Sequence, residues 1–349
     1  MAFITGLMLI DAPASALNNA GLDSAGRTEN AVRTKTVRGF PCVSAQALRY
    51  WWRTTMEQRE PAWRAAPIYR EGKVAYTDAD PIKWWDDDLF GYMRAPSKKG
   101  ERAAFAGATP VSTEITRVSP LRVSTLVGLQ RGVEEDFGTM ARQEGDAVPH
   151  QHEFYRTVLR GALSLDLDRV GTFTYRERTG YRNLDEVRRR EAQEAGLEHR
   201  EEAKEYRLPR EERARRVACL LRGLGVLAGG AKQSIHYTDV TPVVLLLAVV
   251  AGGNNPLSFL LGADVNGQPA VDLRAVEEFA RVWHDQVLSP VYAGWVQGFQ
   301  DAARERLWGK LEDLSQNGGL RGTVKGHPRE VLESLVRDLE GAAHGDWLA

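Results

Sequence analysis

The strongest chemical signal in the sequence is a stretch in which basic, amide and hydroxyl side chains surround two tryptophans. Residues 33 to 53 read RTKTVRGFPCVSAQALRYWWR and contain no acidic residue, although the whole chain has 46 basic and 47 acidic residues and a formal net charge of −1. Guanidinium groups bind phosphate in a forked geometry, and amides and hydroxyls can bind phosphate oxygens and the ribose 2′-hydroxyl. These residue types indicate binding of a polyanion such as RNA.

The candidate RNA contacts lie on a Gly- and Asn-rich segment, 17 to 41, and on the expected helix that follows it. They are Asn18, Asn19, Arg33, Lys35, Arg38, Ser44, Gln46, Arg49 and Arg53. A structural alternative stays open, in which Trp51 and Trp52 belong to the core and the arginines only solvate the outer face of the helix.

A second candidate contact is the segment 229 to 233, which reads GGAKQ. Gly229 and Gly230 would let the backbone approach a phosphate, and Lys232 and Gln233 would supply donors. The alternative is an ordinary helix C-terminus, where a glycine often follows the last turn.

Sequence patterns for other chemistries are weak or absent. The chain contains no G-x-x-x-x-G-K-[ST], H-E-x-x-H or G-x-S-x-G pattern. Residues 223 to 228 match G-x-G-x-x-A, but they close an expected helix, whereas a dinucleotide fingerprint opens one. We therefore expect no cofactor.

Three further groups of residues have side chains suited to metal, redox or acid–base chemistry. His150 and His152 would share one face if they lay on a strand, but with no further ligand nearby a surface-loop pair is favoured. Cys42 and Cys219 are far apart in sequence, which favours a reducing cytoplasm. Asp23 is the one acidic residue of interest, because it lies in the same segment as the basic cluster.

The elements that must position these residues follow from periodicity. We expect a first strand over 3–11, a long loop over 17–41 and a helix over 44–58 with Ser44 as its cap. Residues 60–150 show no clean pattern, and strands return over 152–175, with a bulge or turn near Gly161.

The second half of the chain begins with a charged region, 176–216, that we expect to be a solvated helical insertion. A helix starting near Pro209 should end at Gly229, and the apolar run 242–251 should be a buried strand, since it is too short to cross a membrane. Helical segments are expected over 273–288, 290–314 and 328–342. Without the insertions the order is βαββαβ, as in the ferredoxin-like or RRM fold, so the fold class is α+β.

Four stretches together resemble the DevR/Cst type of the CRISPR-associated Cas-seven family, the type I-B-like guide-RNA backbone subunits of Cascade complexes. The stretches are FITGLMLIDAPASALNNAG, RTKTVRGFPCVSAQALRYWWR, HEFYRTVLRGALSLDL and GVLAGGAKQSIHYTDVTP. The resemblance implies an RRM-like palm with inserted finger and thumb subdomains and a helical C-terminal region. The implied divisions are palm 1–58, finger 59–150, palm 151–175, thumb 176–208, palm 209–262 and helical region 263–349.

The resemblance also implies a function. Several copies would stack along the guide RNA (crRNA), bind its backbone through the residues named above, and leave its bases free to pair with target DNA. The partners would be the guide, target DNA, further copies of the chain and other Cascade subunits, in the cytoplasm, with no membrane and no catalysis. Two alternatives remain: an endoribonuclease that uses Asp23, and a Cascade that guides transposition.

Overall fold

Two long strands, β1 (Ala2–Ser15) and β13 (Val148–Asp166), form the centre of a large sheet in the computed structural model, which describes residues 1–349 except 23–30, 72, 97–107, 141–143 and 147. They pair antiparallel, with Phe3 opposite Asp166 and Ala12 opposite Thr157. On the other side of β1 lies β17 (Val244–Ala251), also antiparallel. The expected first strand and the expected buried strand near 242–251 are both confirmed.

The sheet extends to both sides of this centre and has twelve strands among the described residues. Its main order is β21-β20-β17-β1-β13-β11-β5-β4, and β10, β12 and β3 pair with other parts of β13. The remaining strands of the sheet are β2 (Asn19–Leu22), β3 (Ala31–Thr34), β4 (Thr36–Val37), β5 (Phe40–Val43), β10 (Leu121–Val123), β11 (Leu126–Gly128), β12 (Glu134–Met140), β20 (Val291–Trp295) and β21 (Thr323–Gly326).

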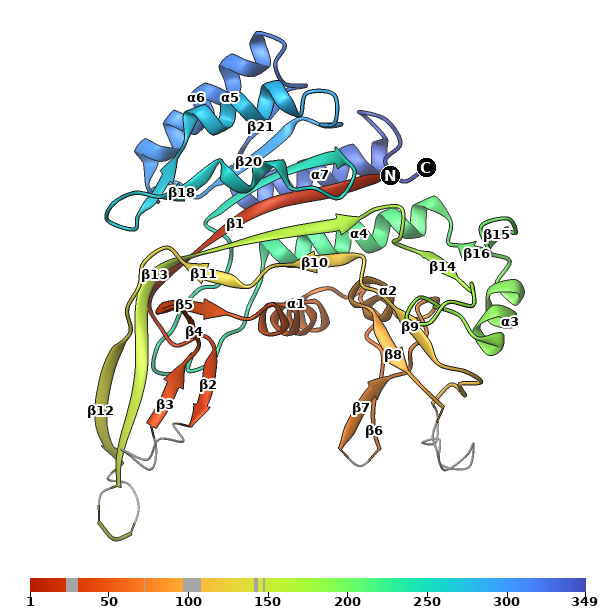
Figure 1. Ribbon diagram of the computed structural model, residues 1–349, viewed down its shortest axis with the longest axis horizontal. Helices are drawn as coiled ribbons and strands as arrows, with labels where there is room; N and C mark the ends of the chain where they lie inside the picture. The colour runs from red at the N-terminus through yellow and green to blue at the C-terminus, as the bar shows by residue number, and fades with distance from the viewer. Residues whose placement is uncertain (23–30, 72, 97–107, 141–143, 147) are drawn as a thin grey trace.

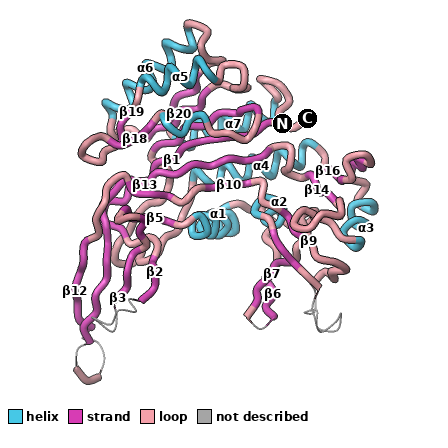
Figure 2. The backbone as a smooth tube through the Cα atoms, in the orientation of Figure 1, coloured by secondary structure: helices cyan, strands magenta, loops and turns pink. Residues whose placement is uncertain are grey.

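Helices cover both faces of the sheet (Figures 1 and 2). On one face Ile4 and Met8 of β1 pack in a core with residues of α1 (Ala45–Arg59), α4 (Arg210–Gly225) and α7 (Pro328–Gly341). On the other face Leu7 and Leu9 pack in a core with residues of α5 (Leu273–Val282) and α6 (Asp301–Gln316). Because alternate residues of a strand point to opposite faces, burial of both faces explains why β1 and β17 are almost continuously apolar.

Helix α1 confirms the expected helix over 44–58. Ser44 caps it by accepting a hydrogen bond from the Ala47 amide at 3.3 Å. Trp51 and Trp52 are buried, so the core interpretation of the tryptophans is right, and the Trp52 indole donates to the Leu220 carbonyl at 3.0 Å. The G-x-G-x-x-A match starts inside α4, where a Cβ on Gly223 would lie 2.0 Å from the sulfur of Met56. That glycine therefore lets α1 and α4 approach closely.

Three expectations about secondary structure are wrong. Strand β13 continues through Gly161 without a turn, and Leu126 packs against this glycine, since a Cβ there would lie 2.3 Å from Leu126 Cδ2. The helix that starts after Pro209 ends at Gly225, four residues before the expected end at Gly229. Residues 290–314 begin with β20, which joins the sheet; short apolar runs do not distinguish a buried strand from a helix.

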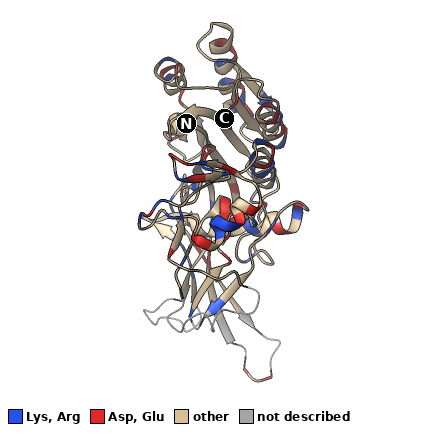
Figure 3. Cartoon of the chain, turned by 90° about the vertical axis from the view of Figure 1, so that its right-hand side faces the viewer, with Lys and Arg blue, Asp and Glu red and all other residues tan. Residues whose placement is uncertain are grey.

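The charged region 176–216, expected to be a solvated helical insertion, instead consists of the start of α4 and, before it, a small folded module. Its helix α3 (Glu186–Glu194) packs near a three-stranded sheet of β14 (Thr172–Thr174), β16 (Glu205–Arg207) and β15 (Glu198–Arg200). Phe173, Tyr206 and Leu208 belong to its core, and Arg188 is fully buried, donating to the carbonyl oxygens of Asp78 and Ala79. Figure 3 shows that basic and acidic residues lie close together along the chain on this side of the molecule.

Residues 60–120 leave the sheet after α1 and return to it at β10. Their elements are β6 (Ile68–Glu71), β7 (Val74–Thr77), α2 (Trp85–Phe90), β8 (Tyr92–Arg94) and β9 (Ile115–Arg117). Two smaller strands, β18 (Leu261–Ala263) and β19 (Pro269–Val271), and a short 3-10 helix, Pro256–Phe259, lie before α5. Within the described ranges, every helix is too short or too polar to span a bilayer.

A buried ion network joins the inserted segment to the rest of the fold. Asp88 of α2 accepts hydrogen bonds from Arg117 of β9 and from Arg216 of α4, the latter at 2.7 Å, and from the Gly171 amide at 3.0 Å. All three charged side chains are almost fully buried. Next to this network, burial and the neighbouring Asp86 carboxylate raise the pKa of Asp87 to about 7.

Candidate nucleic-acid interface

The N-terminus of α1 is where the predicted RNA contacts converge. The Asn18 side-chain oxygen accepts a hydrogen bond from the Ser44 amide at 2.9 Å, and the Asn18 carbonyl accepts one from the Lys35 amide at 2.8 Å. Asn18 thus connects the end of β1 to the start of β4 and to the cap of α1. Asn18 and Ser44 fix the backbone here, so their direct role is structural.

The segment expected to be a loop, 17–41, contains β2, β3, β4 and the start of β5. Strands β4 and β5 form a hairpin whose two-residue turn is Arg38 and Gly39, with φ values of 50° and 79°. Two successive positive φ values are typical of a type I′ turn, which fits the twist of paired strands. The turn presents Arg38 to solvent, and Lys35 is exposed beside it.

The second candidate segment lies directly against the first. The Ala231 amide donates to the Leu17 carbonyl at 3.0 Å, although the two residues are more than 200 positions apart. Lys232 is half-buried in this segment and has a φ of 56°. The two motifs found separately in the sequence therefore form one continuous surface around the start of α1.

Gly229, Gly230 and Gln233 have packing roles that the sequence did not indicate. A Cβ on Gly229 would lie 2.3 Å from the Trp51 ring, and one on Gly230 would lie 2.5 Å from Leu17. The Gln233 amide closes the loop by donating to the Gly229 carbonyl at 2.5 Å and accepting from the Thr238 amide at 2.9 Å. A direct phosphate contact by Gln233 would require this loop to open.

Replacing Gly229 with alanine should destabilise the protein by about 1–3 kcal/mol, because the new methyl group would overlap the Trp51 ring in a packed region. Gly309 is the matched control: it lies inside α6 with no atom within 4 Å of an added Cβ, so Gly309→Ala should be neutral or stabilising by up to about 1 kcal/mol. Chemical denaturation of both variants measures the difference, and equal free energies of unfolding would contradict the packing role.

Arg33 is held by acidic side chains from other strands. Its Nη1 lies 2.8 Å from Glu153 of β13 and 2.7 Å from Glu135 of β12. Glu153 also accepts from the Thr34 amide at 2.7 Å. A phosphate would have to compete with these carboxylates for Arg33, so a contact between Arg33 and the guide backbone stays a prediction.

Arg49 and Arg53 point away from solvent and into the fold. Arg49 donates to the Phe90 and Leu121 carbonyls and to Ser119 Oγ, and burial lowers the pKa of Arg49 to about 10. The Arg53 guanidinium lies 4.7 Å from the centre of the Phe90 ring, and burial lowers the pKa of Arg53 as well. Both arginines attach α1 to the inserted segment, so a phosphate would have to compete with these contacts.

Of the predicted contacts, Asn19, Lys35, Arg38 and Gln46 are exposed, and Lys232 is half-buried. Lys35 and Arg38 carry the positive charge of this group on one hairpin, immediately before the capped start of α1. The exposed N–H groups and positive dipole end of a helix favour anions. This hairpin, with the start of α1, is the part of the predicted site that can receive a phosphate.

A histidine cluster lies beside this surface, and only His150 and His152 of its members stand out in the sequence. His150 and His152 lie on β13 with nearly parallel rings, so the strand arrangement is correct and the surface-loop pair is wrong. The loop after Gly230 brings His236 to them: its Nε2 is 2.9 Å from Nε2 of His152, and its ring stacks on Phe154 at 5.1 Å. Nothing local in the sequence linked His236 to residues 150–154, because the contact spans 84 positions.

The pKa of His152 is lowered by burial and by the neighbouring His236, so the unfolded chain binds a proton at this side chain more readily than the folded one. Stability should therefore fall as the pH drops below about 6.5, the ordinary value for histidine. His152→Asn should reduce this acid sensitivity. Melting temperatures of both proteins between pH 7.5 and 5.5 test it, and parallel curves would contradict the assignment.

Side chains that could bind a metal ion are not grouped within the described ranges. No group of three or more His, Cys, Asp or Glu side chains is arranged there to hold a metal ion. Cys42 and Cys219 are both buried free thiols. Asp23, on which the endoribonuclease alternative depends, lies outside the described residues.

Comparison with known proteins gives one family and one fold. Residues 14–263 match the model of the family described as "CRISPR-associated negative auto-regulator DevR/Csa2". Among solved structures, a chain of a "CRISPR RNA-guided surveillance complex" has a TM-score of 0.51 at 15% identity, covering 98% of this chain and 99% of that one. A chain of a "CRISPR RNA-guided surveillance complex, pre-nicking" has a TM-score of 0.53 at 14% identity, covering 96% and 99%. No curated protein matches significantly.

Proposed function

The chain belongs to the DevR/Csa2 family of CRISPR-associated proteins, and from this premise we propose that it is a guide-RNA-binding backbone subunit of a CRISPR surveillance complex. Its partners in this role are the guide RNA, further copies of the chain, the other subunits of the complex, and target DNA that pairs with the guide. The observation that carries the proposal is the exposed basic hairpin, Lys35 and Arg38, beside the capped start of α1.

The proposed palm is a ferredoxin-like unit. The order β17-β1-β13-β10, with each neighbouring pair antiparallel and with α1 and α4 on one face, is the order of the split βαββαβ motif. In an RRM the opposite face is open and its aromatic residues stack on bases. Here α5 and α6 cover that face, so the proposed RNA path runs along the hairpin β4–β5 and the start of α1.

The type of binding follows from the residues that remain exposed. Lys35 and Arg38 can neutralise phosphates, and Asn19 and Gln46 can donate to phosphate or ribose oxygens. The tryptophans of α1 are buried and cannot stack on bases. The proposed contact is therefore independent of base sequence, as is required of a subunit that holds any guide while base pairing selects the target.

We extend the proposal to projections on either side of α1. Figure 1 shows the paired strands β12 and β13 extending from one end of the sheet and the hairpin β6–β7 extending from the inserted segment, both toward the same side as α1. A strand of RNA that follows the hairpin β4–β5 would pass between them. The family resemblance implies that 176–208 is the thumb and 59–150 the finger. The shape agrees better if the paired strands β12 and β13 take one of these two roles.

The test is to co-express the chain with the other subunits of its complex, with and without a CRISPR array. The expected product with the array is a large particle that contains RNA and several copies of the chain, and without the array only small species. A monomer that is unchanged by the array would contradict the proposal.

We further propose that the chain has no catalytic activity of its own. The purified particle is incubated with guide-matched RNA and magnesium, and intact RNA is expected. Cleavage that disappears in Asp23→Ala would instead establish the endoribonuclease alternative, whereas cleavage unaffected by this change would point to a different subunit.

A further inference from the structure

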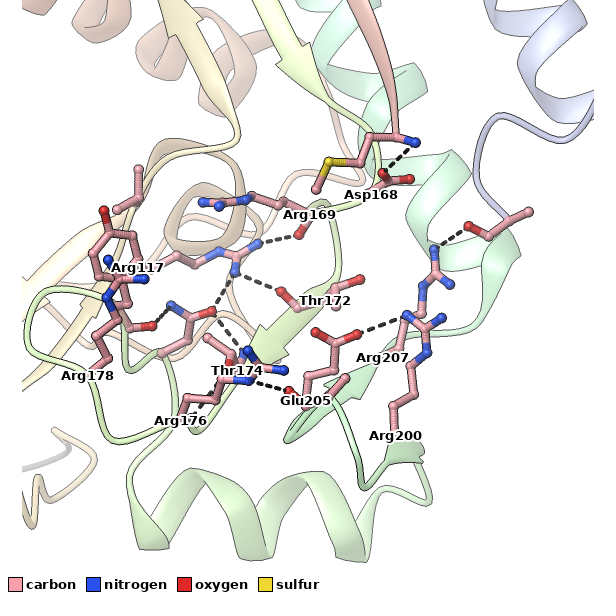
Figure 4. Close-up of a pocket in the computed structure, with 16 residues that line it drawn as sticks. Arg117, Asp168, Arg169, Thr172, Thr174, Arg176, Arg178, Arg200, Glu205 and Arg207 are labelled. Atoms are coloured by element: carbon pink, nitrogen blue, oxygen red, sulfur yellow. Dashed lines mark hydrogen bonds and ion pairs between the residues drawn. The ribbon is translucent and has the colours of Figure 1, made fainter. Parts of the chain in front are cut away.

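A cavity of about 610 Å³ lies at the other end of the molecule from β4 and β5, between the module of β14–β16 and the end of β13. Six of its lining residues are arginines, against two acidic side chains, Asp168 and Glu205. Figure 4 shows these arginines arranged around it, with Arg178 and Arg207 on opposite sides. They are Arg117, Arg169, Arg176, Arg178, Arg200 and Arg207.

The two carboxylates of the wall are already paired. Glu205 lies 2.9 Å from Nη1 of Arg200, and Asp168 lies 3.5 Å from the amino group of Met1. Arg117 is paired with Asp88, which it shares with Arg216, and Arg169 lies 3.4 Å from Asp166. The cavity therefore has an excess of positive charge that comes from the remaining arginines, Arg176, Arg178 and Arg207.

Arg207 is the clearest sign of an unfilled site. It is only 7% exposed, it donates through Nη2 to the carbonyl oxygens of Leu348 and Ala349, and its Nε has no hydrogen-bond partner among the described residues. A buried guanidinium donor without a partner is costly. Burial and the nearby Arg200 also lower the pKa of Arg207.

Arg176 and Arg178 supply the accessible donors. Both are exposed, and neither has a carboxylate partner in the described part of the chain. Arg176 uses only its Nε, which donates to the Ala203 carbonyl at 2.9 Å, and Arg178 stacks on Tyr181 at 4.3 Å. The forked ends of both guanidinium groups are free to bind an anion, and the Arg178–Tyr181 pair offers a flat surface for an aromatic base.

We propose that this cavity binds a nucleotide through its phosphate, with the base against Tyr181 and Arg178. The volume is within the range of pockets that hold small organic ligands and far exceeds the space of one inorganic ion. The combination of guanidinium forks, hydroxyls of Thr172 and Thr174 and an exposed aromatic ring favours a nucleotide over an acidic peptide. The nucleotide is either free or part of a strand. This inference does not rest on the proposed function.

The test uses the full chain and three probes: ATP, an oligodeoxythymidine of about twelve residues, and a polyglutamate peptide. Hydrogen–deuterium exchange is measured with and without each probe. ATP or the oligonucleotide should protect peptides within 172–183 and 198–207, whereas binding at the proposed guide-RNA surface would protect 31–49. Protection by ATP identifies a free nucleotide, and protection by the oligonucleotide alone identifies a strand.

The variant is Arg176→Glu with Arg178→Glu, and its control is Arg190→Glu with Arg215→Glu, two exposed arginines with the same total charge change outside the cavity. The first pair should weaken binding of the protecting probe about tenfold or more at low salt, and the second should change it little. Equal losses in both pairs, protection only by polyglutamate, or no protection at 172–183 and 198–207 would overturn the proposal.

Discussion

Reversing the charge of Lys35 and Arg38 together should weaken binding of guide RNA about ten- to a hundredfold near physiological salt and prevent assembly of the RNA-containing particle. Both side chains are exposed on one hairpin at the start of α1, and each change replaces a phosphate partner with a carboxylate that repels it. The measurement is the amount of guide that co-purifies with the variant, together with the dependence of affinity on salt concentration.

The matched control reverses Arg190 and Arg215, which are about 70% exposed and lie away from this hairpin. It changes the total charge of the chain equally, so it should leave assembly nearly unchanged. Circular dichroism of both variants verifies that they are folded. If the two variants lose guide RNA to the same degree, the hairpin has no special part in RNA binding.

Replacing Asp88 with alanine should destabilise the protein by about 3–5 kcal/mol, the largest effect on stability that we expect of one substitution. The change leaves Arg117 and Arg216 buried without their carboxylate and removes the acceptor of the Gly171 amide. Asp88→Asn keeps the shape of the side chain and should lose somewhat less. Chemical denaturation gives the free energies of unfolding.

Glu202 provides the control for this prediction, since it is exposed in the turn between β15 and β16. Glu202→Ala should change the free energy of unfolding by less than about 0.5 kcal/mol. If Asp88→Ala is no more destabilising than Glu202→Ala, the buried network does not hold the inserted segment to α4.

The sequence predicted the helices and strands that are specified by the hydrophobic pattern of neighbouring residues. The first strand, the helix capped by Ser44 and the apolar strand before Ala251 are each specified by residues within a few positions of one another. Strand β20 was missed because its five residues are all buried on a sheet that forms only when distant strands meet. A run that is apolar throughout carries no periodicity to distinguish a strand from a helix.

For the candidate site, the sequence indicated which segments to consider but not what surrounds each of their residues. The sequence located the two segments that meet around α1, but it could not show that Glu135 and Glu153 pair with Arg33, or that the Phe90 carbonyl accepts from Arg49. These partners come from distant parts of the chain. A basic stretch without acidic neighbours in sequence therefore does not reveal which of its arginines are already paired in the fold. The same limitation hid the contact between His152 and His236.

The central claim, that copies of this chain form a backbone along a guide, is tested most directly by changing the length of the guide. Complexes are assembled on a series of guides of increasing length and weighed intact by native mass spectrometry. The account predicts that the number of copies of this chain rises in steps with guide length while the other subunits stay constant. A copy number that does not change with guide length would contradict it.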